Sequence, residues 1–302
     1  MSPVRAKQKK SLPPPTTISN FVLACVLHLC RKYVLFDIDT KVGVYLITVM
    51  CGSFLADFCP LSRNHYLANK RNLFNVCFVK WSWLWTFCMV GSFIYLSSMV
   101  YCRGDLRTVF RHCSRLIVST LVWWVFTTSF VEIERRSGFC LKSTFVTKEQ
   151  CIMNGSRWIA FDISGHCFLM IYCCLVISEE LKIFRNWDRN VRICFDRHEE
   201  PSDDEEVYEG EVTTTATSYR VEAESTKTVY LQNTYYLRIL FVVISMLHLV
   251  WDCMLVSTVL FFHSFAQKFV AALLAVAAWF VTYRLWYKQN FSPGLPGEGV
   301  FM

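Results

Sequence analysis

Apolar residues along the chain gather into long runs, and short polar or charged stretches separate these runs. A helix needs about 20 mostly apolar residues to cross a hydrocarbon core of about 30 Å. The runs close to that length predict six membrane-spanning helices, over 42–59, 79–101, 115–132, 163–181, 235–262 and 267–287. The pattern therefore predicts an all-α integral membrane protein, built as a six-transmembrane-helix bundle.

The stretch 18–36 is also apolar, but it contains Arg31 and Lys32. Charged side chains within so short a run favour an amphipathic helix that lies in the membrane interface over one that crosses the membrane. Six crossings place both chain ends on the same side of the membrane. The chain then divides into a basic N-terminus, four crossings, an acidic insert, two crossings and a tail, at 1–41, 42–195, 196–229, 230–287 and 288–302.

Composition supports the membrane assignment. Hydrophobic residues make up 54% of the chain and charged residues 18%, against roughly 45–50% and 25% in soluble domains. The net charge of +7 is unevenly spread, because 196–228 holds 11 of the 24 acidic residues. Beyond a short basic tail, no basic cluster of the kind that nucleic acid requires is evident, so no nucleic-acid partner is expected.

The acidic insert has too few apolar residues to offset the entropy of ordering the chain, which predicts disorder over 196–229. A solvated linker is the simpler interpretation, and a regulatory tail is the alternative. The loops on the side of the chain ends hold about twice as many Lys and Arg residues as the others, so the positive-inside rule makes that side cytosolic. The loops 60–78 and 133–162 then lie on the lumenal side.

The first candidate for chemistry is Ser164-Gly165-His166, which begins the fourth crossing. The free N–H groups at a helix N-terminus favour anions such as phosphate, and a histidine there can protonate a leaving oxygen. His263 ends the fifth crossing and therefore lies on the same side. Two histidines at one membrane boundary could act as nucleophile and general acid. The simpler alternatives are an N-cap serine beside an interfacial histidine, and a polar turn residue.

Lys70 and Arg71 place cations in the loop 61–72, on the side where cations are expected to be scarce. A phosphoanhydride would be a natural partner for them. The alternative is simple tolerance, because the positive-inside rule is a bias and forbids nothing.

Acidic residues could orient a boundary histidine. Asp57 and Asp162 lie near the same boundary as His263, whereas Asp252 lies about 16 Å deeper along its helix, at roughly 1.5 Å per residue. Asp252 follows His248 by four residues, and ionisable groups inside membrane helices are usually paired. We therefore expect His248 and Asp252 to satisfy one another.

The loop 133–160 contains Cys140, Cys151 and the sequon that begins at Asn154. On a lumenal side these residues predict a disulfide and offer a glycosylation site. Most other cysteines lie within apolar runs and are expected to stay free as small buried side chains. No metal-binding spacing of Cys and His is evident, and no metal or other cofactor is expected.

Together these motifs resemble the fat storage-inducing transmembrane (FIT) family of the endoplasmic reticulum (ER). The resemblance covers about 42–195 and 230–296. It rests on SRNHYLANKRNLFNVCFVKWSWLWTF (62–87), AFDISGHCFL (160–169), FFHSFAQK (261–268) and WFVTYRLWY with FSPGLP (279–296). The family implies a multi-pass ER membrane protein with six helices, cytosolic termini and a lumenal active site, related to the lipid phosphate phosphatases.

The activity that the resemblance implies is hydrolysis of fatty acyl-CoA at its phosphoanhydride, giving acyl 4′-phosphopantetheine and adenosine 3′,5′-bisphosphate. The implied biology is ER lipid homeostasis and lipid droplet formation, with binding of di- and triacylglycerol. A protein of another class is the alternative: a non-catalytic lipid-binding protein that partitions neutral lipid into droplets.

By the same likeness His263 would be the nucleophile and His166 the acid for the leaving group, with Ser164 and Gly165 binding the substrate. The serine, arginine and aspartate around the third-motif histidine of lipid phosphate phosphatases have no counterparts here. The cation that clamps the phosphate is therefore unassigned by the motif. Lys70 and Arg71 are our candidates for it.

Overall fold

The computed structural model describes residues 17–59, 66–69, 71–102, 104–141, 147–187, 189 and 212–297. This part of the chain is almost entirely helical, and the protein is an all-α integral membrane protein, as predicted. Within it, five helical stretches are long and apolar enough to cross a membrane: Ile38–Phe58, Phe74–Tyr101, Leu106–Ser137, Asn233–Phe261 and Phe265–Lys288.

The first half of the chain forms α1 (Ile18–Val34), α2 (Ile38–Phe58), three short turns η1 (Tyr66–Ala68), η2 (Phe74–Phe78) and η3 (Val79–Trp81), α3 (Ser82–Tyr101) and α4 (Leu106–Ser137). The second half forms β1 (Phe139–Cys140), α5 (Lys148–Met153), β2 (Trp158–Ile159), α6 (Gly165–Glu180), η4 (Leu181–Asn186), α8 (Val212–Phe261), α9 (Phe265–Trp279), η5 (Phe280–Leu285) and η6 (Trp286–Lys288).

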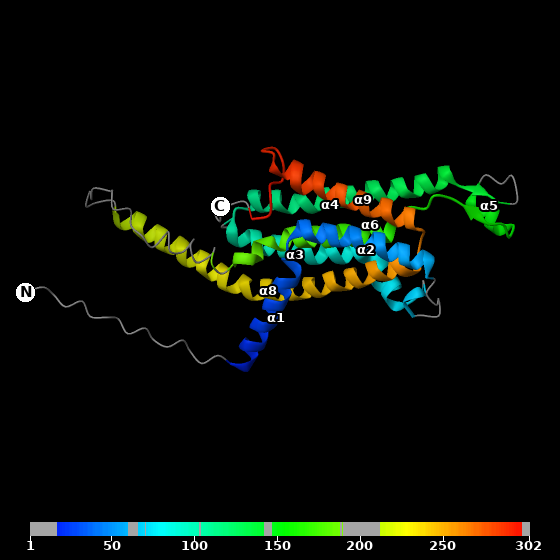
Figure 1. The fold of residues 1–302 in the computed structure, drawn as a ribbon. Coiled ribbons are helices and arrows are strands. Elements are labelled where there is room, and N and C mark those ends of the chain that lie inside the picture. Colours follow the sequence, from blue (N-terminus) through cyan, green and yellow to red (C-terminus); the bar gives the residue numbers. More distant parts are fainter. Residues whose placement is uncertain are drawn as a thin grey trace, which may run out of the picture.

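The long helices run along a common direction, and α1 is inclined to them (Figure 1). The central helix is α6, which packs against α2, α3, α4, α8 and α9 and is buried at every position from Cys167 to Glu180. The outer faces of the surrounding helices expose large apolar side chains, among them Phe54, Trp124 and Leu249. An apolar exterior suits contact with lipid, whereas α6 is surrounded by protein.

The acidic insert differs from the prediction of disorder. The helix α8 begins at Val212 and runs without a break to Phe261, so the backbone of 212–229 is helical. The physical reason is that extending an existing helix adds one hydrogen bond per residue without a new nucleation cost. The remaining part of the insert, 196–211, lies outside the described residues.

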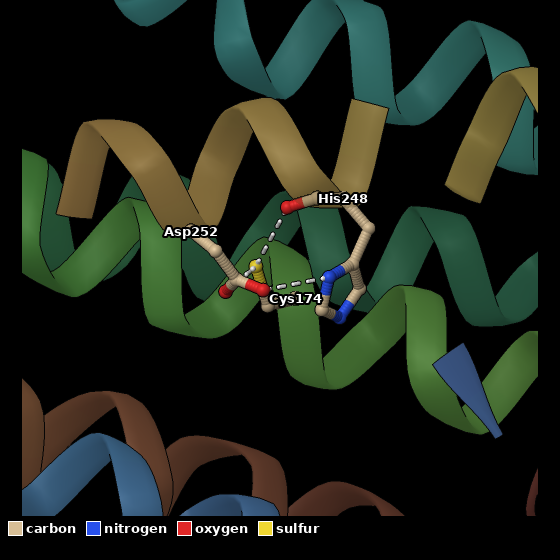
Figure 2. Close-up of side chains that lie close together, drawn as sticks. All are labelled: Cys174, His248 and Asp252. Atoms are coloured by element: carbon tan, nitrogen blue, oxygen red, sulfur yellow. Dashed lines mark hydrogen bonds and ion pairs between the residues drawn. The ribbon is translucent and has the colours of Figure 1, made fainter. Parts of the chain in front are cut away.

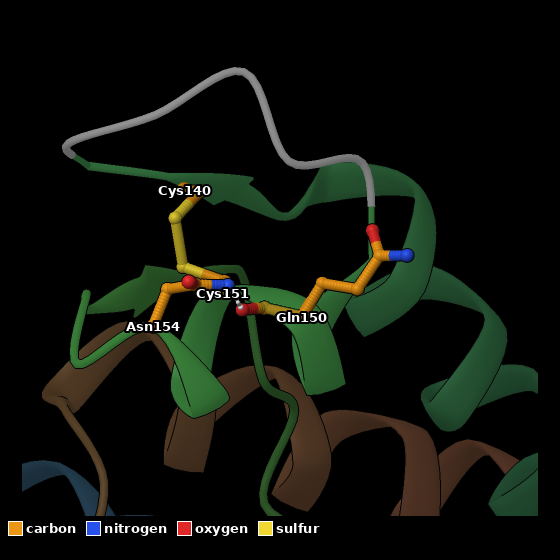
Figure 3. The surroundings of a disulfide bond; sticks show 4 residues. All are labelled: Cys140, Gln150, Cys151 and Asn154. Atoms are coloured by element: carbon orange, nitrogen blue, oxygen red, sulfur yellow. Dashed lines mark hydrogen bonds between the residues drawn. A yellow bond between two sulfur atoms is a disulfide. The ribbon is translucent and has the colours of Figure 1, made fainter.

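A small stapled unit joins α4 to α6. In it β1 pairs antiparallel with β2, and a disulfide joins Cys140 to Cys151 of α5 (Figure 3). Close packing requires a glycine at 138, since a Cβ there would lie 2.2 Å from the Trp158 ring. The side-chain amide of Asn154 in the sequon donates to the Gln150 carbonyl oxygen at 2.8 Å.

Candidate active site

Two helix N-termini lie together at the end of the bundle that carries α5 (Figure 1). The hydroxyl of Ser164 caps α6 by accepting a hydrogen bond from the Cys167 amide at 3.3 Å. Ser264 caps α9 in a reciprocal capping box with Gln267. The Ser164 amide donates to the Gln267 carbonyl oxygen at 3.3 Å. The two histidine-bearing motifs are therefore joined through their backbones.

His263 lies in the tight turn between α8 and α9. It has a left-handed φ of 56°, which is uncommon for a residue other than glycine and persists only where surrounding contacts hold it. Its Nδ1 atom lies 3.7 Å from Oδ2 of Asp162, which is longer than a hydrogen bond. Asp162 is thus one of the two carboxylates that the sequence placed near this histidine.

His166 lies in the first turn of α6 with an exposed side chain. The residue before it, Gly165, faces open space, because a Cβ built there would meet nothing within 4 Å. Packing therefore does not require glycine at this position. The open space beside the N-terminus of α6 is where a phosphate could approach the free N–H groups of the first turn.

Lys268 is a residue that the sequence interpretation missed. Its side chain is only 1% exposed, and its ammonium donates to the Val259 carbonyl oxygen at 2.7 Å. Its own carbonyl oxygen accepts from the Cys167 thiol at 3.5 Å, and the Asp57 carboxylate near the end of α2 attracts its charge. A lysine five positions after His263, at the start of an apolar run, was the available signal.

The cation-bearing loop is anchored to α8, because the Ser257 hydroxyl donates to the Leu67 carbonyl oxygen at 3.4 Å. Arg71 is exposed, and its backbone amide donates to the Asn69 side chain at 2.9 Å. Among the described residues no contact joins the Arg71 guanidinium to either histidine. Lys70 lies outside the described residues.

A second polar cluster, formed by Cys174, His248 and Asp252, lies between α6 and α8 (Figure 2). His248 Nδ1 lies 3.2 Å from Asp252 Oδ2, so the predicted pairing of these residues is confirmed. The other oxygen of this carboxylate accepts from the Tyr45 hydroxyl at 2.9 Å and from the Cys174 thiol at 3.5 Å. The Tyr33 hydroxyl of α1 donates to Oδ2 of Asp252, the oxygen that lies near His248.

The donor atoms of Cys174, His248 and Asp252 all lie within 4.8 Å of one another, a spacing that could hold a metal ion. These atoms already take part in hydrogen bonds, however. On the far side of the imidazole the Lys41 ammonium lies 3.5 Å from His248 Nε2 and donates to Ser178 at 2.9 Å. A divalent cation would have to displace several donors beside a fixed positive charge, so the arrangement fits a hydrogen-bonded network that ties α1 and α2 to α6 and α8.

A buried ion pair lies at the C-terminal end of α6. The Arg115 guanidinium of α4 donates to both carboxylate oxygens of Glu180, at 2.8 and 2.9 Å, and both side chains are 1% exposed. The Tyr283 hydroxyl donates to the same carboxylate at 2.7 Å. These bonds fix the end of α6 opposite the histidines against α4 and η5.

The fold and the site define a polytopic helical membrane protein with two histidines at adjoining helix N-termini. The model of the family described as fat storage-inducing transmembrane protein matches residues 63–137 and 133–283. The chain belongs to this family.

Several curated relatives are similar along most of the chain. The acyl-coenzyme A diphosphatase FITM2 of Drosophila melanogaster is 33% identical over 290 residues, covering 95% of this chain and 67% of the relative. The protein of the same name from Homo sapiens is 33% identical over 259 residues, covering 83% and 84%. The one from Caenorhabditis elegans is 29% identical over 278 residues, covering 92% and 89%. No solved structure matches the chain.

Proposed function

We propose that the chain is a fatty acyl-CoA diphosphatase of the ER membrane, which cleaves the phosphoanhydride to acyl 4′-phosphopantetheine and adenosine 3′,5′-bisphosphate. The observation that carries the proposal is the junction of the two histidine motifs. The Ser164–Gln267 backbone bond and the approach of Asp162 to His263 bring the start of α6 and the turn before α9 together. The activity in the names of the relatives supports the same reaction.

In the proposed mechanism a nitrogen of His263 attacks one phosphorus of the anhydride. A P–N bond forms as the bridging P–O bond breaks, and His166 gives a proton to the departing phosphate oxygen. Asp162 stabilises the imidazolium as positive charge develops on His263. Water, deprotonated by His166, then attacks the phosphorus bound to His263. The P–N bond breaks, the second phosphomonoester product leaves, and the free imidazole is restored.

The first turn of α6 would hold the phosphate oxygens. The amides that follow Ser164 and Gly165 point out of the helix N-terminus, where partial positive charge gathers. Lys70 and Arg71 remain our candidates for a cationic clamp. The anchoring of their loop to α8 through Ser257 supports this assignment, because the same helix leads to His263.

We propose that α6 also crosses the membrane, as the fourth of six crossings, and that the bundle is related to the lipid phosphate phosphatases. The burial of α6 between α8 and α9 supports a full crossing. The histidines would face the lumen and the termini the cytosol, which is consistent with the positive-inside bias and with a disulfide at the histidine end. Di- and triacylglycerol binding, and a role in lipid droplet formation, complete the proposal.

The test measures release of adenosine 3′,5′-bisphosphate from oleoyl-CoA by the purified full-length protein. His166→Ala and His263→Ala should each abolish turnover, and the double variant should lose no more, because residues that act as one unit are not additive. His198→Ala, which changes a histidine of the acidic insert, is the matched control and should retain turnover. A wild-type protein that binds triacylglycerol but releases no product would favour the non-catalytic alternative.

A further inference from the structure

A basic groove lies at the end of the bundle opposite the histidines, where α1 meets α2. Four basic side chains line it, those of His28, Arg31, Lys32 and Arg185, together with a single carboxylate, that of Asp37. Three of the four come from α1, and Arg185 comes from η4, which follows α6 directly. Two segments distant in the sequence therefore contribute cations to one site.

The carboxylate in this groove is already engaged. Asp37 is the N-cap of α2 and accepts hydrogen bonds from the amide and hydroxyl of Thr40, at 2.8 and 2.7 Å. These bonds lower its pKa below the usual value for aspartate. Arg185 donates to a backbone carbonyl oxygen, that of Leu35, at 2.5 Å, and no described carboxylate pairs with Lys32. The groove therefore keeps an excess of positive charge.

The groove also adjoins the first membrane-spanning helix. It ends at Asp37, and the first long apolar helix begins at the next residue, Ile38. Large apolar side chains flank it, since Leu29 is 65% exposed and Phe36 is 52% exposed. A soluble anion would contact only the basic side chains of the groove, whereas the acyl chains of a lipid would also contact the exposed apolar side chains beside it.

We propose that this groove binds the phosphate headgroup of an anionic phospholipid, with the acyl chains lying over Leu29 and Phe36. Lysine and arginine form charge-assisted hydrogen bonds with phosphate oxygens, and basic pockets between membrane helices suit such headgroups. The site is separate from the histidines, since α2 separates Asp37 at its start from Asp57 near its end by about 30 Å, at 1.5 Å per residue. The lipid would be a ligand of the protein and not its substrate.

Native mass spectrometry of the full-length protein tests the proposal by titration with dioleoyl phosphatidate or dioleoyl phosphatidylcholine in one detergent. The wild-type protein should bind phosphatidate more tightly. The double variant Lys32→Gln/Arg185→Gln should weaken phosphatidate binding by roughly fivefold for each charge removed. The control Arg107→Gln/Lys288→Gln removes two exposed charges elsewhere and should bind as the wild type does.

Lys32→Gln alone guards against misfolding of the double variant, because it changes one exposed side chain and should still show about a fivefold loss. Equal affinity for the two lipids, or unchanged affinity in the charge variants, would overturn the proposal. Competition by glycerol 3-phosphate at the same concentration as phosphatidate would also overturn it, since that would show a site for free phosphate. The acidic stretch 199–206 could occupy the groove in place of a lipid. If phosphatidate bound only after deletion of this stretch, the stretch itself would be the occupant and the lipid proposal would be overturned.

Discussion

The ammonium of Lys268 and the carbonyl oxygen of Val259 lie 2.7 Å apart, across the turn that carries His263. Val259 belongs to the last turn of α8, where backbone carbonyls have no partner within the helix. Lys268 belongs to the first turn of α9. The bond therefore clamps the two helices on either side of a histidine whose backbone is left-handed, and Lys268 acts as a positioning residue.

Lys268→Met should lower kcat for acyl-CoA hydrolysis by at least about tenfold with little change in KM, because displacing a reacting group by about 1 Å can cost about 100-fold. The matched control is Lys41→Met. Lys41 is also buried and donates to a helix carbonyl oxygen, that of Val34, at 2.7 Å, but it lies far from the turn. A kcat that falls equally in both variants would show that Lys268 contributes only to stability.

Gly165→Ala should fold normally and yet impair hydrolysis. The added methyl group meets no protein atom within 4 Å, but it enters the space where the phosphate would lie against the first turn of α6. We expect KM to rise or kcat to fall by about tenfold, equivalent to about 1.4 kcal/mol of lost transition-state stabilisation. Gly43→Ala, in α2, also meets nothing within 4 Å and should leave both constants unchanged in the same assay.

In both variants, replacing glycine by alanine within a helix should leave the melting temperature unchanged or raise it, since alanine favours the helix by up to about 1 kcal/mol. A Gly165→Ala protein with full activity would contradict the placement of the phosphate beside this residue.

The Cys140–Cys151 disulfide closes a loop with a sequence separation of 11, so its chain-entropy contribution should be about 3 kcal/mol at most. The stapled unit leads into the candidate active site, and the Phe161 amide donates to the Ser137 hydroxyl at 3.0 Å. Cys140→Ser/Cys151→Ser should therefore lower the melting temperature and reduce turnover less than His166→Ala does.

Mass spectrometry of alkylated, non-reduced peptides should find these two cysteines linked in protein purified from cell membranes. The control is Cys253, exposed on α8, which should be alkylated. Alkylation of both Cys140 and Cys151 would contradict the lumenal placement of this end.

The network around Asp252 should contribute to stability and not directly to catalysis. Tyr45→Phe removes one hydrogen bond and should lower the free energy of unfolding by about 1 kcal/mol. Asp252→Ala leaves the Tyr33, Tyr45 and Cys174 donors without their acceptor and should cost more, about 1–3 kcal/mol. Denaturation in detergent gives both values. Loss of turnover in a Tyr45→Phe protein of near-normal stability would show that the network acts on the reaction.

Run length and motif position in the sequence predicted a large part of this molecule. Long apolar runs identified the five helical stretches that are long and apolar enough to cross a membrane, because crossing a bilayer imposes a minimum length. Counting crossings placed His166 and His263 at one end, where the backbones of their motifs are joined. The pairing of His248 with Asp252 followed from a spacing of four residues, which puts two side chains on one face of a helix.

Other features depend on packing between distant segments, and no local pattern reports them. Arg115 and Glu180 form a buried pair although they are 65 residues apart in sequence. Lys268 was not among the predicted site residues, since its contact depends on where the carbonyl oxygen of Val259 comes to lie. The helical backbone of 212–229 was missed because composition describes a segment alone, whereas this one continues a stable helix.

The shortness of α6 has a consequence for where the chemistry takes place. With 16 residues the helix is about 24 Å long at 1.5 Å per residue, against about 30 Å of hydrocarbon. The bilayer need not become thinner to match the length of α6, because neighbouring helices separate α6 from the lipid. If α6 crosses the membrane as proposed, its N-terminus opens into a recess below the bilayer surface. The acyl chain of the acyl-CoA substrate could then stay in the membrane leaflet while its phosphoanhydride reaches the histidines. Turnover would therefore vary with bilayer thickness.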